Sequence, residues 1–261
     1  PTHLPAAHHH DRAQRLSLSA RIIALCVTWS AAFIGYELSD VFATPNTAPN
    51  TAPNTAPLNE ADPSADPSAD LADYPLDALS REIPPRGRVK CPKLDLITYR
   101  GTHIKYHKPT RVHPAFKERL ERFELLVREV ALEIYGRAPH KIRHLGTYNC
   151  RRIGGYPNLL SEHSFGNGID VASFVFPRLR RGAELPEGVP RSLRRGFTVD
   201  MLKHWTAKRA GGGLHKRFLH TLGRRLIASQ IFRVLLGPSF PGHKNHFHLD
   251  CAPYELTSIF E

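Results

Sequence analysis

The sequence predicts an α+β fold, because two amphipathic helices and several short strands follow one another without a regular βαβ order. Residues 113–135 and 214–229 carry apolar side chains at spacings of three and four, which is the period of a helix with one buried face. The stretches around them are short and apolar, as strands are. We therefore expect a small, mainly antiparallel sheet with flanking helices.

The first 43 residues have the order of an export signal. Three arginines precede the apolar run 22–36, and small residues lead to a possible cleavage site after Ala43. The run is shorter than the roughly 20 residues of a spanning helix, although residues 22–42 would serve as an inner-membrane anchor if uncleaved. A buried core helix is the alternative. Either form of the signal sends the rest of the chain to the periplasm or cell envelope.

Residues 44–85 are predicted to form a disordered linker. They contain the repeats TPNTAPNTAPNTAP and ADPSADPSAD, in which a proline every four residues blocks both helix and sheet ladders. Such a segment is an extended spacer that lets a domain reach away from a membrane into a cell wall. A dispensable low-complexity insert is the alternative. The folded domain is expected to comprise residues 86–261.

Charge is divided unevenly along the chain, whose formal net charge is +12. Residues 1–85 hold ten Asp/Glu against four Lys/Arg, whereas residues 86–261 hold 32 Lys/Arg against 14 Asp/Glu. A basic domain implies an anionic partner, such as nucleic acid, anionic lipid or peptidoglycan. The export signal and the lack of an aromatic-basic motif argue against nucleic acid. We expect a monomer that meets the membrane only through its N-terminal segment.

The elements of the domain can be assigned in order. The helix over 113–135 has Pro114 in its first turn and stops at Gly136, and residues 141–152 alternate imperfectly and predict a strand. Residues 177–200, rich in Arg, Pro and Gly, predict a basic loop near the site that grips anionic wall polymer, or else a solvated insertion without a partner.

The C-terminal part begins with the helix over 214–229. A short strand follows at 232–236, where Gly237 ends it, and another at 246–250.

The last strand carries two imidazoles and a carboxylate on one face. Residues two apart in a strand share a face, so His246, His248 and Asp250 project together, while Phe247 and Leu249 project into the core. This ridge is a plausible metal platform. A half-exposed strand with a polar outer face explains the pattern equally well.

A second cluster lies upstream. His163 and Asp170 are seven residues apart with two glycines between them, which permits a tight loop that folds His163 back toward Asp170. A catalytic zinc ion takes three protein ligands and keeps one position open. His163, Asp170 and one histidine of the 246/248 pair supply such a set. A capped loop and a surface carboxylate are the alternatives.

Three motifs, in their order along the chain, resemble those of one family. They are Y-N-C-R at 148–151, S-E-H-x-x-G-x-x-I-D at 161–170, and L-G-P-x-x-x-x-H-x-x-H-F-H-L-D at 236–250. Together they are similar to the bacterial extensin-like C-terminal domain family over roughly residues 86–255. That family resembles the lysostaphin-type and D-Ala-D-Ala zinc metallopeptidases.

The resemblance implies a central antiparallel sheet cradling one Zn²⁺ ion held by His163, Asp170 and His248. It also implies a zinc metallopeptidase that hydrolyses peptide bonds in peptidoglycan during cell-wall remodelling. His246 is then the candidate for the general acid or base, or for support of the oxyanion. Arg151 would orient or polarise the substrate carbonyl, unless it is an ordinary surface arginine.

Other positions follow from the same resemblance. Ser161 and Asp250 are expected to fix imidazole tautomers or loop shape, and Glu162 is a weaker candidate base. Some relatives place a Glu three residues before the last histidine ligand, where this chain has Asn245. That departure leaves a second hypothesis open, a catalytically silent, metal-containing module that binds the cell wall.

Cysteine usage is compatible with export. Cys26 lies in the leader, and the three cysteines of the domain allow at most one internal disulfide. We expect Cys91–Cys150, because both flank predicted core elements, with Cys251 left over. No two cysteines have zinc-ligand spacing.

Overall fold

The computed structural model describes residues 74–208 and 210–260. The expected leader at 1–43 and most of the expected linker lie outside these residues. Within the described part of the chain, no helix has both the length and the apolar character needed to cross a membrane.

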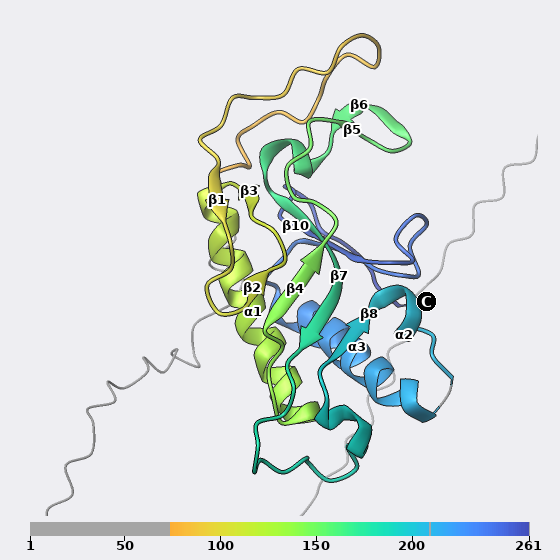
Figure 1. The fold of residues 1–261 in the computed structure, drawn as a ribbon. Helices are drawn as coiled ribbons and strands as arrows, with labels where there is room; N and C mark the ends of the chain where they lie inside the picture. The colour runs from red at the N-terminus through yellow and green to blue at the C-terminus, as the bar shows by residue number, and fades with distance from the viewer. Residues whose placement is uncertain (1–73, 209, 261) are drawn as a thin grey trace, which may run out of the picture. The chain divides into compact units, whose positions relative to one another are not determined.

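A seven-stranded mixed sheet forms the centre of the fold (Figure 1). Its strands run in the order β11-β9-β10-β7-β4-β2, and β8 also pairs with β7. The strands are β2 (Lys105–Tyr106), β4 (Lys141–His144), β7 (Gly168–Phe176), β8 (Phe197–Asp200), β9 (Val234–Leu236), β10 (Phe247–Asp250) and β11 (Leu256–Ser258).

The α+β class is confirmed, but the sheet is larger than the small one expected, and it is mixed, with antiparallel pairs at its centre. Strands β2 and β4 are parallel, as are β9 and β11, so both outer pairs of the sheet differ from the antiparallel centre. These edge strands have only two or three residues, too few to show a period of two in the sequence.

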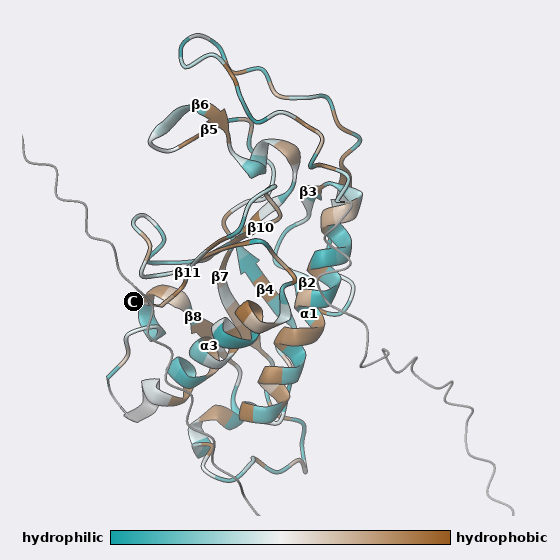
Figure 2. Cartoon of the chain, turned by 180° about the vertical axis from the view of Figure 1, so that it is seen from behind, coloured by the Kyte–Doolittle hydropathy of each residue, from teal (hydrophilic) through white to brown (hydrophobic). Residues whose placement is uncertain are grey.

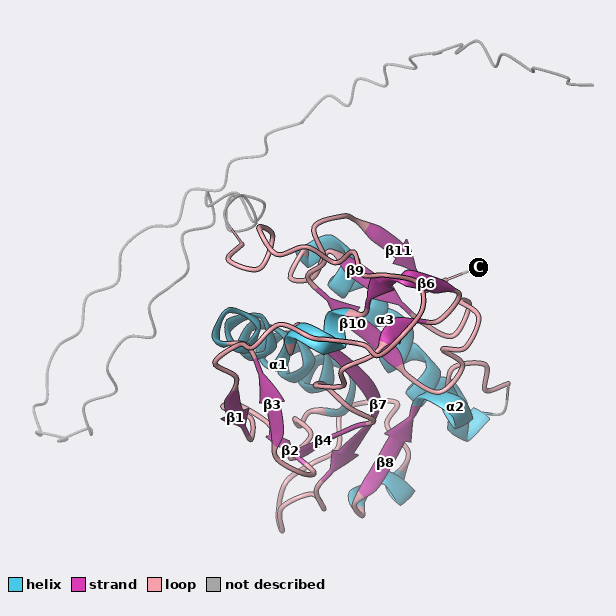
Figure 3. Cartoon of the chain, turned by 90° about the horizontal axis from the view of Figure 1, so that it is seen from above, coloured by secondary structure: helices cyan, strands magenta, loops and turns pink. Residues whose placement is uncertain are grey.

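Two long helices cover one face of the sheet. They are α1 (Pro114–Tyr135) and α3 (Ala210–Ser229), which contact each other and lie in front of β4, β7 and β8 when the molecule is seen from behind (Figure 2). In the view from above, the same strands lie on one side of both helices (Figure 3). Among the described residues, the opposite face of the sheet is therefore free of long helices.

Helix α1 agrees with its prediction, because its ends carry clear signals. The His113 side chain accepts a hydrogen bond from the Ala115 amide at the N-terminus, and Gly136 takes the left-handed conformation at the C-terminus, with φ of 64°. Helix α3 begins at Ala210, one turn before the predicted start at 214.

Shorter elements complete the fold. Two small hairpin-like sheets pair β1 (Ile97–Tyr99) with β3 (Thr110–Val112) and β5 (Arg152–Ile153) with β6 (Tyr156–Leu160). Single turns of helix occur at η2 (Glu162–Phe165), η3 (Arg191–Arg194) and α2 (Met201–His204).

Two predicted segments need correction. The strand expected over 141–152 ends at His144, where the Leu145 amide donates to the Asp170 carbonyl and the chain turns into a loop. The basic loop expected over 177–200 ends in strand β8, in which Val199 is fully buried and pairs with Phe174 of β7.

The core lies between the helices and the sheet. Aromatic side chains dominate it, and ring pairs such as Phe174–Phe218 and Tyr135–Phe176 join α3 and α1 to β7 at centroid distances of 5.3 and 4.8 Å. This packing fixes the position of β7, which also carries a residue of the candidate site.

The folded part begins before the expected boundary at Arg86. Tyr74 and Leu76 are buried in the core, Arg81 is buried in an ion pair, and Glu82 forms an isolated bridge with Leu159. We call residues 74–85 the N-terminal strap. It contains three prolines and no helical or alternating apolar pattern, which is why sequence patterns assign it to the linker.

A disulfide joins Cys91 to Cys150, the pair expected from the sequence. The remaining thiol of the domain, Cys251, is free and buried. Burial raises the pKa of the Cys251 thiol to about 12. The disulfide therefore ties the segment before β1 to the loop that leads into β5.

Glu124 of α1 holds the loop between β1 and β2. Its buried carboxylate accepts hydrogen bonds from the Tyr99 hydroxyl at 2.7 Å and from the amides of Thr102, His103 and Ile104 at 3.0, 2.6 and 3.0 Å. Replacing an acceptor by a donor here leaves buried amides without a partner.

We expect Glu124→Gln to lower the free energy of unfolding by about 2 kcal/mol, because the side-chain NH2 of glutamine is a donor and cannot accept the hydrogen bonds that one carboxylate oxygen accepts. Urea unfolding measures the change. The exposed Glu118, on the same helix, provides the matched control, and Glu118→Gln should leave the midpoint nearly unchanged. Equal effects of the two substitutions would contradict this role of Glu124.

Candidate metal centre

Three elements bring the candidate ligands together on the sheet face that lacks long helices in the described part of the chain. His163 lies on η2, Asp170 on β7 and His248 on β10. Asp170 and His248 are direct register partners in the antiparallel β7–β10 pair, so their side chains leave the sheet on the same side.

The loop between His163 and Asp170 depends on Gly166. Gly166 has a φ of 63°, and a Cβ there would come within 2.8 Å of the Leu96 side chain. Glycine at this position lets the chain reverse toward the strand. A Cβ at Gly168 would lie 3.7 Å from the His163 ring and 3.6 Å from the His248 ring, which are ordinary van der Waals distances.

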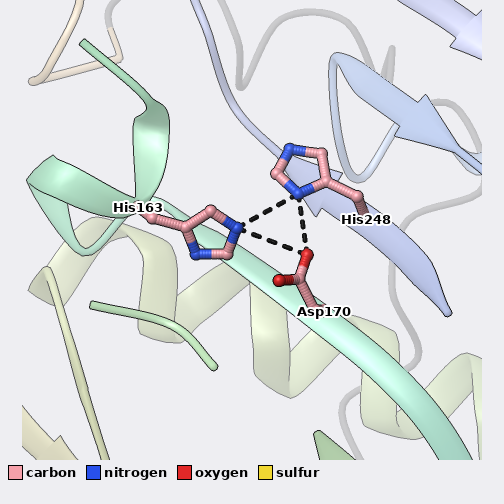
Figure 4. Close-up of side chains that lie close together, drawn as sticks. All are labelled: His163, Asp170 and His248. Atoms are coloured by element: carbon pink, nitrogen blue, oxygen red, sulfur yellow. Dashed lines mark hydrogen bonds and ion pairs between the residues drawn. The ribbon is translucent and has the colours of Figure 1, made fainter. Parts of the chain in front are cut away.

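Three ligand-type atoms meet in one cluster (Figure 4). His163 Nε2 lies 3.2 Å from His248 Nδ1 and 3.3 Å from Asp170 Oδ1, and His248 Nδ1 lies 2.9 Å from Asp170 Oδ1. Around a tetrahedral zinc ion with bonds of about 2.0–2.1 Å, neighbouring ligand atoms are about 3.3 Å apart. The donor set and its spacing therefore fit a divalent ion such as zinc.

Hydrogen bonds orient both imidazoles. His163 Nδ1 lies 2.6 Å from the Thr147 carbonyl, to which it donates, so Nε2 is the ring nitrogen left to face the cluster and bind a metal ion. His248 Nε2 lies 2.6 Å from Asp250 Oδ2, and the other oxygen of Asp250 accepts from the Ala252 amide. Partners of this kind fix the tautomer of a metal-ligating histidine.

The pKa values of Asp170 and His248 are shifted in opposite directions within the cluster. Burial alone would raise the pKa of Asp170, but hydrogen bonds from His163 and His248 hold it well below its ordinary value. Burial alone would lower the pKa of His248, but hydrogen bonds to Asp170 and Asp250 raise it to about 10. The cluster therefore favours a positive charge beside Asp170.

His246 lies beside the cluster. Its Nε2 is 3.5 Å from Asp170 Oδ1, and its Nδ1 is 2.8 Å from the side-chain oxygen of Asn245. Burial lowers the pKa of His246 to about 4, so the ring is neutral near pH 7. A neutral imidazole at this position can accept a proton.

His243 is a further histidine at the site that the sequence analysis did not assign. Its ring centroid lies 4.8 Å from that of His246 and 5.8 Å from that of His248. Burial lowers its pKa, and the positive charge of Arg151 adds to this effect. Three histidines occur in the six residues 243–248, but only His248 lies in β10, and the strand expected over 246–250 begins one residue later, at Phe247.

The loop of Arg151 is held by both Ser161 and Ser164, and the Ser161 amide donates to the Arg151 carbonyl at 3.0 Å. Ser161 is buried and precedes η2, but its side chain makes no capping hydrogen bond. The Ser164 hydroxyl instead contacts the carbonyls of Asn149 and Arg151 at 3.2 and 2.9 Å and accepts from the Arg151 amide at 3.0 Å. Ser164 therefore holds the Arg151 loop against η2.

Glu162 points into a separate buried network. Arg81 of the N-terminal strap donates to both of its oxygens, at 2.8 and 3.2 Å, and Asn167 donates to it at 2.6 Å. Asn167 in turn accepts from the Tyr74 hydroxyl at 2.5 Å. Because these bonds occupy its carboxylate, Glu162 acts as an anchor for the ligand loop rather than as a base.

The comparisons with known proteins bear on the N-terminal part of this domain. Residues 72–185 match the family described as Extensin-like protein C-terminus. No curated protein and no solved structure matches the chain. The matched region begins at the N-terminal strap and includes His163, Asp170 and Arg151, although it ends before His248. The match supports the extensin-like family for this part of the chain.

Proposed function

We propose that this protein is a zinc-dependent hydrolase of peptide bonds in bacterial peptidoglycan. The observation that carries the proposal is the convergence of His163, Asp170 and His248, whose ligand atoms lie within 3.3 Å of one another. Each imidazole has its outer nitrogen hydrogen-bonded, as in catalytic zinc sites.

The residues around the cluster suit hydrolysis. Zinc would lower the pKa of a water molecule toward neutrality and polarise the scissile carbonyl. His246, neutral and beside Asp170, is placed to accept a proton. His243 borders the cluster, and Arg151 is near enough for its charge to lower the pKa of His243, so both would orient the substrate carbonyl. We propose a peptide bond with D-amino acids as the one that is cut, because the extensin-like family that the motifs resemble is itself similar to lysostaphin-type and D-Ala-D-Ala metallopeptidases.

Export and an anionic polymer partner are part of the proposal. The Cys91–Cys150 disulfide supports an oxidising compartment, such as the periplasm. The basic balance of residues 86–261 supports a polyanionic wall rather than a neutral substrate. We propose a monomer held in the cell envelope, with any membrane contact made through residues 22–42.

A catalytically silent wall-binding module is the second candidate. It is favoured by Asn245, which stands where some relatives carry a Glu base and whose side chain contacts His246. Such a module would hold the metal and bind the wall without cutting it.

One experiment separates the two candidates. Purified full-length protein is assayed for bound zinc, for sedimentation with peptidoglycan, and for release of soluble muropeptides, with and without a chelator. We expect about one zinc per chain and release that the chelator abolishes. Zinc and sedimentation without release would favour the silent module, and the absence of any bound metal would overturn both.

A further inference from the structure

A pocket of about 630 Å³ lies where α2, α3 and the loop between β9 and β10 approach one another. Its floor is aromatic. Trp205 lies with its ring centroid 4.3 Å from that of His220 and 5.3 Å from that of Phe260, and His220 Nε2 contacts the Trp205 carbonyl at 3.1 Å. The floor is thus a fixed apolar surface rather than a collapsed gap.

The rim of this pocket is cationic. Lys208, Lys216 and Lys244 line it, and no Asp or Glu of the described residues does. In the described part of the chain, none of the three lysines takes part in an ion pair. Three unneutralised ammonium groups above an aromatic floor favour an anionic ligand with an apolar or ring-shaped body. We call this site the lysine pocket.

The lysine pocket borders the metal centre through a single loop. Pro238, Ser239 and Lys244 of the β9–β10 loop line the pocket, whereas His243 and His246 of the same loop face the metal centre. Phe247 packs edge-on against Trp205 at 5.5 Å, on the side of β10 opposite to His248. One loop therefore supplies residues to both sites.

We propose that the lysine pocket binds a carboxylate-bearing stretch of the polymer that is cut at the metal centre. The identity of the polymer rests on the proposed function, but the binding of an anion in the pocket does not. The volume suits a ligand of a few amino-acid or sugar units. Peptidoglycan stems carry free carboxylates at this scale, so the pocket would select stems that keep them.

The test uses Trp205 as its reporter. The chain has two tryptophans, so Trp29→Phe leaves Trp205 as the single one. Full-length protein with this change and Asp170→Asn, which prevents turnover, is titrated with a muropeptide, with its amidated form that lacks free carboxylates, and with inorganic phosphate. Equilibrium dialysis measures the same affinities independently of fluorescence.

We expect saturable binding of the muropeptide, and about tenfold weaker binding after Lys216→Ala/Lys244→Ala, which removes two charge contacts. Amidation of the ligand should have a similar effect. Lys90→Ala/Lys93→Ala removes the same charge from exposed positions away from the pocket and should change nothing.

Three outcomes would overturn the proposal. They are equal losses in the two double variants, no binding of the muropeptide, and phosphate binding as tight as muropeptide binding. If the protein binds the muropeptide as expected but releases no peptides from peptidoglycan, the lysine pocket stands and the hydrolase assignment fails.

Discussion

Asp170→Asn is expected to remove bound zinc and to reduce the release of muropeptides by about a thousandfold, which corresponds to about 4 kcal/mol of transition-state stabilisation. The substitution keeps the shape of the side chain but removes the charge that faces both imidazoles. Asp170 Oδ1 lies 3.3 Å from His163 and 2.9 Å from His248, so no other carboxylate in the cluster can replace it on that side.

Metal content after dialysis and peptide release on purified peptidoglycan measure the effect. Asp95→Asn makes the same chemical change at an exposed position and serves as the control. If the Asp170→Asn protein kept one tightly bound zinc and its activity, Asp170 would be neither a ligand nor a catalytic residue. If it kept zinc but lost peptide release, Asp170 would act in the reaction without binding the metal.

Arg81→Ala is expected to lower the free energy of unfolding by about 3–5 kcal/mol, because it leaves the buried Glu162 carboxylate without its charged partner. Arg81 also donates to the carbonyls of Leu76 and Leu79 at 2.5 and 2.6 Å, so the N-terminal strap loses its internal bonds. Glu162 is next to His163, and zinc affinity should fall with stability.

Denaturant unfolding of the zinc-free protein measures this cost. Arg86→Ala, at an exposed position just beyond the strap, should have an effect within about 0.5 kcal/mol. Adding Glu162→Gln to Arg81→Ala should restore part of the stability, since the uncompensated charge is then gone. A loss below about 1 kcal/mol for Arg81→Ala would mean that the pair contributes little.

The sequence predicted what local periodicity and spacing encode. Helix α1 has apolar residues at helical spacing between a capping His113 and a left-handed Gly136, so both its type and its ends could be predicted. The strand of His248 alternates cleanly because Phe247 and Leu249 are fully buried on the other side. The loop from His163 to Asp170 was recognisable from its glycines.

Features that depend on distant partners escaped the sequence. The N-terminal strap looks like linker, because Glu162 and Asn167, which hold its Arg81 and Tyr74, lie 81 and 93 positions away along the chain. The edge strands β2 and β11 are too short to have a period. The sequence does not predict that His243 lies at the site, because a loop places its ring beside those of His246 and His248, and loop positions have no periodic pattern.

The N-terminal strap also determines which piece of the chain can be studied in isolation. A recombinant fragment cut at Arg86 would discard Tyr74 and Arg81. With them it would lose the donors that hold Glu162, just before the loop from His163 to Asp170, and Asn167 within that loop. If such a fragment were inactive, the cause would be the loss of these hydrogen bonds, and the result would not show that the protein lacks hydrolase activity. Assays of this protein should therefore start upstream of Tyr74.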